Sequence, residues 1–118
     1  MAASMVHVYV SAPLHGIPGE SPEINVRMAL RAGDQLMDEG LVPFIPHLAW
    51  YMNGYHPRDE ADWLNFYALP WLERSDCVLR IGGPSKGADI ELRLATQIGK
   101  PVFLSIPQIV IWKEAQVG

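Results

Sequence analysis

The chain turns from strand to helix within the stretch Cys77-Val78-Leu79-Arg80-Ile81-Gly82-Gly83-Pro84-Ser85-Lys86-Gly87. Its apolar run ends at two glycines, Ser85 is a favourable helix N-cap, and Gly99 supplies a helix stop. Apolar residues then recur at helical spacing, and Glu91 lies on the same stripe as Leu94 and Ala95. The sequence therefore predicts a carboxylate that faces the sheet, beside a loop of the size that binds a phosphate.

Strand and helix signals alternate along the rest of the chain. The predicted strands are 6–10, 41–45, 77–81 and 101–104, and the predicted helices are 21–39, 58–74 and 86–98. Helices that connect successive strands require parallel pairing with right-handed crossovers. We therefore expect residues 1–118 to form a single α/β domain, with a Rossmann-like (flavodoxin-like) parallel sheet of four to five strands flanked by helices.

Three segments are harder to interpret. Pro43 weakens the second strand or places it at an edge of the sheet, and Pro70 is expected to kink or split the helix over 58–74. The connection between them is long and rich in aromatic residues. The tail at 109–112 fits either a strand or a helix.

Composition excludes several classes of protein. With 49% apolar residues in 118, the chain can build a core without disulfides or metals. A net charge of −4 argues against binding to a nucleic-acid polymer. The single cysteine, Cys77, falls in a predicted buried strand, and no metal-ligand spacing of His and Cys occurs, so we expect no metal and no cofactor. The start of the chain shows neither an export signal nor an apolar run near the roughly 20 residues that span a bilayer, so we expect a cytoplasmic protein with no membrane contact.

Polar residues follow three of the predicted strands. Because the carboxyl ends of parallel strands meet at one edge, we expect these residues to gather where open α/β sheets bind ligands. The predicted substrate-binding or phosphate-binding set is Ser11, His15, Gly16, Ser85, Gly87 and Asp89. The predicted catalytic pair is Glu91 and His47. Backbone N–H groups at the start of the third helix suit an anion such as a monophosphate.

Several segments together resemble a known family. They are Tyr9-Val10-Ser11-Ala12-Pro13, Pro46-His47, Ser75-Asp76-Cys77-Val78, Pro84-Ser85-Lys86-Gly87-Ala88-Asp89-Ile90-Glu91 and Gly99-Lys100-Pro101-Val102. In combination they are similar to the nucleoside 2-deoxyribosyltransferase-like superfamily, over roughly residues 6 to 104. That superfamily includes deoxyribosyltransferases and nucleoside 5'-monophosphate N-glycosidases. The resemblance implies a nucleoside or nucleotide as substrate, a hydrolase or transferase reaction, and a homodimer or larger homo-oligomer.

The resemblance also implies roles for individual residues. Glu91 matches the glutamate nucleophile, and Ser85 matches the serine that contacts the 5'-phosphate. The chain departs from the pattern at Ala68, where the family has an acidic residue. Asp62, Asp89 and His47 are candidate substitutes, of which His47 lies in a suitable loop and titrates in a useful range.

Each of these residues also has a structural interpretation. Glu91 could be a paired structural carboxylate, and Ser85 an N-cap alone or a cap that also binds phosphate. The loss of the acid at Ala68 favours a second hypothesis, a nucleotide-binding or regulatory module without catalysis. A third hypothesis is a structural subunit whose aromatic surface docks a partner.

Overall fold

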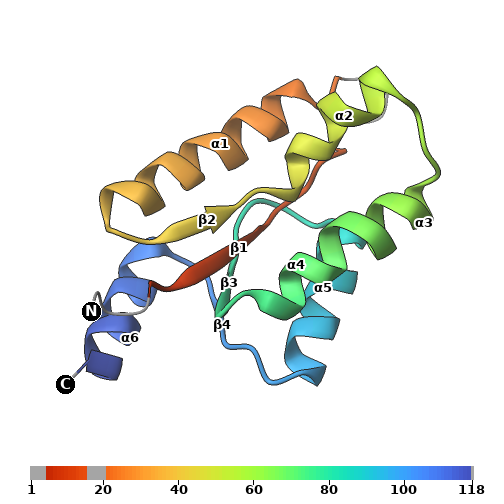
Figure 1. The fold of residues 1–118 in the computed structure, drawn as a ribbon. Helices are drawn as coiled ribbons and strands as arrows, with labels where there is room; N and C mark the ends of the chain where they lie inside the picture. Colours follow the sequence, from red (N-terminus) through yellow and green to blue (C-terminus); the bar gives the residue numbers. More distant parts are fainter. Residues whose placement is uncertain (1–4, 16–20, 118) are drawn as a thin grey trace.

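The computed structural model describes residues 5–15 and 21–117, and it has one parallel sheet with helices on both faces (Figure 1). Four strands lie in the order β2-β1-β3-β4. They are β1 (His7–Ser11), β2 (Val42–Phe44), β3 (Cys77–Arg80) and β4 (Val102–Phe103). The predicted Rossmann-like α/β class is confirmed, with four strands in the described residues. Since β1 and β3 lie at the centre of the sheet, the loops that follow them adjoin each other.

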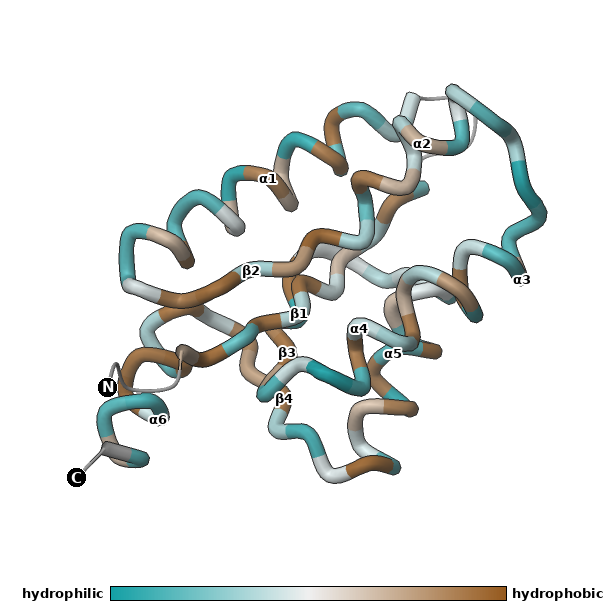
Figure 2. Tube along the Cα trace, in the orientation of Figure 1, coloured by the Kyte–Doolittle hydropathy of each residue, from teal (hydrophilic) through white to brown (hydrophobic). Residues whose placement is uncertain are grey.

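The helices are α1 (Glu23–Asp38), α2 (Ala49–Tyr55), α3 (Glu60–Trp63), α4 (Leu69–Arg74), α5 (Lys86–Gln97) and α6 (Ile106–Val117). Helix α1 packs with α6 on one face of the sheet, and α4 and α5 cover the other (Figure 1). In Figure 2 the trace of α1 alternates between hydrophilic and hydrophobic segments, as expected for a helix with one face on a sheet. The alternation of strand side chains thus supplies two separate cores.

The middle of the chain agrees in part with the sequence prediction. The sequence predicted a helix over 58–74 that Pro70 kinks or splits, and the structure has α3, a π-helical segment at Leu64–Ala68, and then α4. Pro70, the second residue of α4, has no backbone N–H to bond to the preceding turn, which accounts for the interruption. Helix α2 was not predicted, because it has only seven residues and contains Asn53 and Gly54, which are poor helix formers. The ambiguous tail is part of α6.

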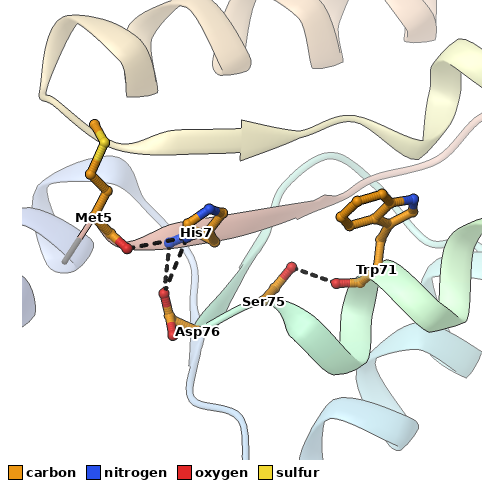
Figure 3. Close-up of polar contacts among 5 residues, drawn as sticks. All are labelled: Met5, His7, Trp71, Ser75 and Asp76. Atoms are coloured by element: carbon orange, nitrogen blue, oxygen red, sulfur yellow. Dashed lines mark hydrogen bonds and ion pairs between the residues drawn. The ribbon is translucent and has the colours of Figure 1, made fainter.

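Strand β2, which contains Pro43, lies at an edge of the sheet, as predicted from that proline. His7 is the first residue of β1, and its side chain is 56% exposed. At this amino end of the sheet the backbone N–H of His7 donates to Asp76 Oδ2 at 2.8 Å, and Ser75 Oγ donates to the Trp71 carbonyl at 2.8 Å (Figure 3). The first contact joins β1 to the entry of β3, and the second closes the end of α4, at the end of the sheet opposite the polar loops.

In the described part of the chain, none of the helices is both long enough and apolar enough to span a membrane.

Candidate active site

Helix α5 carries Glu91 into the interior, as the sequence predicted. The helix begins at Ser85, whose backbone is extended and whose Oγ accepts a hydrogen bond from Ala88 N–H at 3.2 Å. From that cap, Ala88, Glu91 and Ala95 follow at spacings of three and four residues, and all three are buried. Glu91 is only 8% exposed. The N-cap thus sets the face of α5 that turns a carboxylate toward the sheet.

Two hydroxyl groups of β1 hold the Glu91 carboxylate. Ser11 Oγ donates to Glu91 Oε1 at 2.9 Å, and the Tyr9 hydroxyl donates to Oε2. Tyr9 and Ser11 are fully buried and two residues apart on one strand, so they point to the same face of the sheet. Each carboxylate oxygen therefore accepts one hydrogen bond and keeps a further lone pair for another partner.

Burial and hydrogen bonding act in opposite directions on this carboxylate. Burial raises the pKa of Glu91, while the hydrogen bonds from Tyr9 and Ser11 and the charge of Arg80 lower it, and the pKa remains above its usual value. Burial, together with the neighbouring Glu91, raises the pKa of Tyr9 well above its usual value. Tyr9 consequently keeps its proton and acts as a hydrogen-bond donor to Glu91.

His47 lies in the short 3-10 helix Pro46–Leu48 and is almost fully buried, with 4% of its surface exposed. Its Nε2 lies 2.9 Å from the Ala12 carbonyl oxygen and 3.2 Å from that of Pro13. Both partners are acceptors, so Nε2 carries the proton and donates it to the loop that follows β1. Nδ1 is buried and has no hydrogen-bond partner among the described residues. Burial lowers the pKa of His47, which favours the neutral ring. His47 thus fixes the loop that continues from Ser11.

The other predicted site residues occupy more open positions. Ser85 is half-buried and caps α5, whereas Gly87 and Asp89 are exposed on the first turn of that helix. His15 is exposed in the loop after β1. Gly16 lies outside the described residues. The structure therefore brings Ser11 into direct contact with Glu91, and leaves the roles predicted for the remaining residues as predictions.

Tyr9 and Arg80 adjoin Glu91 but were not predicted as site residues. In sequence, Tyr9 resembles any aromatic residue of a buried strand, and Arg80 resembles a charge at a strand end. The alternation of side chains along each strand could have identified both residues. Tyr9 shares a face of the sheet with Ser11, and Arg80 shares a face with Val78. The register pairs Ser11 with Arg80, which places both at the same carboxyl edge.

Ala68 is the position where the sequence departs from the superfamily pattern. It is buried at 8% exposure and belongs to an apolar cluster with Tyr9, Leu72, Val78 and Ala95. The π-helical segment ends at this residue. Its side chain therefore lies on the Glu91 side of the sheet but supplies only a methyl group.

The loops after β1 and β3 meet at Gly82. This glycine has a φ of +82°, which favours glycine, and a Cβ added there would lie 2.7 Å from Pro13 Cδ. Any larger residue would separate the loop held by His47 from the loop that leads to Ser85. In the described residues, no cluster of three or more His, Cys, Asp or Glu side chains is arranged to hold a metal ion.

Comparison with known proteins supports the fold. The structure is similar to that of a 2-deoxyribosyltransferase from the psychrotolerant bacterium Bacillus psychrosaccharolyticus, with a TM-score of 0.55 and 24% sequence identity. The similarity covers 82% of this chain and 69% of that enzyme. No family model and no curated protein sequence matches the chain. The chain thus has a nucleoside 2-deoxyribosyltransferase-like fold, as the sequence motifs predicted.

Proposed function

We propose that this protein cleaves the N-glycosidic bond of nucleosides or nucleoside 5'-monophosphates, by hydrolysis or by deoxyribosyl transfer, with Glu91 as the nucleophile. One observation carries the proposal: a buried carboxylate, held by Tyr9 and Ser11, lies where the loops of a parallel sheet converge. The protein of similar fold is described as a 2-deoxyribosyltransferase and as a biocatalyst for nucleoside synthesis, which agrees with this substrate class.

The chemistry requires a carboxylate in this setting. Cleavage of the bond between C1' and the base nitrogen develops positive charge at C1', which an adjacent carboxylate stabilises. A Glu91 oxygen then forms an ester bond to C1' as the bonding electron pair leaves with the base. Water, or a second base, attacks C1' and releases Glu91. The hydrogen bonds from Tyr9 and Ser11 orient the carboxylate before the reaction begins.

The residues of the proposed substrate-binding group follow β1 in the sequence or belong to the start of α5. Backbone N–H groups at the start of α5, with Ser85 and Gly87, suit a 5'-phosphate, and His15, Gly16 and Asp89 complete the proposed set. The departing base must also gain a proton. His47 remains the proposed donor for that step, in the form protonated at both ring nitrogens, because the methyl group of Ala68 supplies no proton.

The protonation step also favours a second candidate function. Ala68 is buried in an apolar cluster, and the Nε2 proton of His47 is donated to two loop carbonyls. A site without an acid for the leaving base would bind nucleotides without cleaving them. The alternative is therefore a nucleotide-binding or regulatory module that binds its ligand with the same residues.

A homodimer or larger assembly is part of the proposal. Large apolar side chains are exposed on the described surface, among them Tyr55 at 93% and Phe66 at 82%. Association with a second copy would cover such residues. Sedimentation analysis of the purified protein tests this component independently of activity.

The deciding experiment is chromatography of free base released from ribo- and deoxyribonucleosides and their 5'-monophosphates. We expect release by the wild-type protein and a loss of at least about 10³-fold in Glu91→Gln, because an amide is a poor nucleophile at C1'. The matched control is Glu73→Gln, which makes the same change at an exposed position of α4. Faster release from monophosphates than from nucleosides would support the phosphate-binding role of the Ser85 loop.

Thermal shift with the same compounds distinguishes the two candidates. A ligand that binds the folded protein raises its melting temperature whether or not a reaction follows. Stabilisation by nucleoside monophosphates without base release, even with an added acceptor base, would support the binding module. Base release that persists undiminished in Glu91→Gln would overturn Glu91 as the nucleophile.

A further inference from the structure

Arg80 is a charged residue at the carboxyl end of an otherwise buried strand. It is the last residue of β3, and its register partner is Ser11, the donor to Glu91 Oε1. Two residues earlier on the same strand, Val78 belongs to the cluster that packs under α4 and α5. Alternation along the strand therefore directs the Arg80 side chain to the face of the sheet that carries Glu91.

The guanidinium group of Arg80 spans the turn that follows β3. Nη1 donates to the Ile81 carbonyl, and Nη2 donates to the Gly83 carbonyl at 2.7 Å. These carbonyls flank Gly82, the residue that touches Pro13 of the neighbouring loop. A planar guanidinium presents its donors in a fixed fork, so two such bonds restrain the turn more than one ammonium contact would.

The positive charge of Arg80 is also available to Glu91. Carbonyl oxygens occupy part of the guanidinium but do not neutralise it. Among the described residues, the ion pairs within 4.0 Å join His7 to Asp76 and Arg27 to Glu23, and none involves Arg80. The charge of Arg80 favours the ionised state of Glu91 and opposes the effect of burial.

We propose that Arg80 is a positioning residue of this site, which holds the turn between β3 and α5 against the first loop and supplies a positive charge on the face of the sheet that carries Glu91. This inference rests on the proposed function in one respect, which is that the ionised Glu91 carboxylate is the nucleophile. The groups that bear on Glu91 are Tyr9 and Ser11 from β1 and Arg80 from β3. Of these, only Arg80 carries a positive charge.

The test is a carboxyl ¹³C NMR titration of Glu91 in wild type, Arg80→Gln and Arg80→Lys. In Arg80→Gln we expect the Glu91 titration to move to higher pH, because the opposing charge is gone while burial remains. In Arg80→Lys the charge is kept, so the titration should stay near that of wild type. Lysine lacks the planar fork of the guanidinium, so the amide resonances of Gly82 and Gly83 should shift and their hydrogen exchange should accelerate.

The matched control is Arg93→Gln, which removes an exposed arginine from the same helix as Glu91. We expect this variant to leave the Glu91 titration unchanged. An unchanged titration in a folded Arg80→Gln protein would overturn the electrostatic role. Arg80→Lys keeps the charge and can still be measured if Arg80→Gln fails to fold. Unchanged amide exchange in Arg80→Lys would overturn the role of Arg80 in holding the turn.

The titration uses no substrate, so its outcome is separate from that of the proposed function. A shifted titration without base release would leave the Arg80 inference standing and defeat the glycosidase proposal. Where base release is observed, Arg80→Gln should move the acidic limb of the kcat/KM profile to higher pH, an effect that loss of stability alone does not produce.

Discussion

The two faces of the sheet differ in what neighbouring residues of the same strand contact. On β1, Val8 and Val10 pack under α1 and α6, whereas Tyr9 and Ser11 hydrogen-bond the Glu91 carboxylate on the opposite face. All four side chains are fully buried. Burial alone therefore does not distinguish the core residues of β1 from its site residues. The distinction comes from the group that each side chain contacts. A single strand supplies an apolar layer to one side and orients a reactive group on the other.

The sharpest test of this comparison substitutes two adjacent residues of β1. Tyr9→Phe removes the donor to Glu91 Oε2 but keeps the ring, so we expect base release to fall by about 10²-fold with little loss of stability. Val10→Ala should lower the free energy of unfolding by about 2 kcal/mol through lost apolar burial and a cavity. Base-release kinetics and urea denaturation of both variants measure the two effects.

The expected result is a crossed pattern, in which one variant loses rate and its neighbour loses stability. Val10→Ala should retain near wild-type kcat/KM at a temperature where it is folded. If both variants lost activity and stability in equal measure, the two faces would not be functionally separate.

Much of this division was predictable from the sequence, because it depends on local periodicity. The inward direction of Glu91 followed from its stripe with Leu94 and Ala95, and the capping role of Ser85 from its position before that helix. Both features are determined within a few residues, which is why the pattern was sufficient.

The rest depends on contacts between distant segments. Tyr9 meets Glu91 across 82 positions of sequence, and Arg80 gains its role from register with Ser11. No local pattern distinguishes such a tyrosine from a core residue. The π-helical segment likewise depends on how Pro70 is accommodated against the sheet, so the sequence predicted a kink or split at Pro70 but not the π-helical form.

A second, smaller effect concerns the stability cost of the Glu91 carboxylate. Burial raises the pKa of Glu91, so folding favours its protonated form. The resulting contribution to stability is complete below the usual pKa of 4.5, and it is lost as pH rises through the pKa of the folded protein. Glu91→Gln removes that dependence. We expect the variant to melt about 2–5 °C above wild type at pH 8, with the difference shrinking toward pH 4.

Differential scanning calorimetry across this pH range provides the measurement, with Glu73→Gln as the exposed control. If the two faces of the sheet differ as described, Glu91 reduces the stability of the folded protein, whereas Val10 on the apolar face increases it. A melting temperature of Glu91→Gln below that of wild type at pH 8 would show that the hydrogen bonds from Tyr9 and Ser11 outweigh the cost of burial.

The smallest expected effect tests His47, whose hydrogen bonds go to the loop after β1 and not to Glu91. Its pKa is lowered by burial, so its contribution to stability is complete above the usual value of 6.5 and is lost as pH falls through the folded pKa. In that window the unfolded chain takes up a proton that the buried ring does not. We expect wild type to lose less than about 1 kcal/mol there, and His47→Gln to lack this pH-dependent loss.

Urea denaturation at pH values between 8 and 5 measures the effect, with exposed His56→Gln as the control. Protonation would add a second buried N–H at Nδ1, which has no partner among the described residues, and this is the physical reason for the loss. A His47 ring that titrates at or above 6.5 in the folded protein would contradict this account. Such a ring would carry a proton at neutral pH, and its role as the acid for the departing base would gain support over its role in holding the loop.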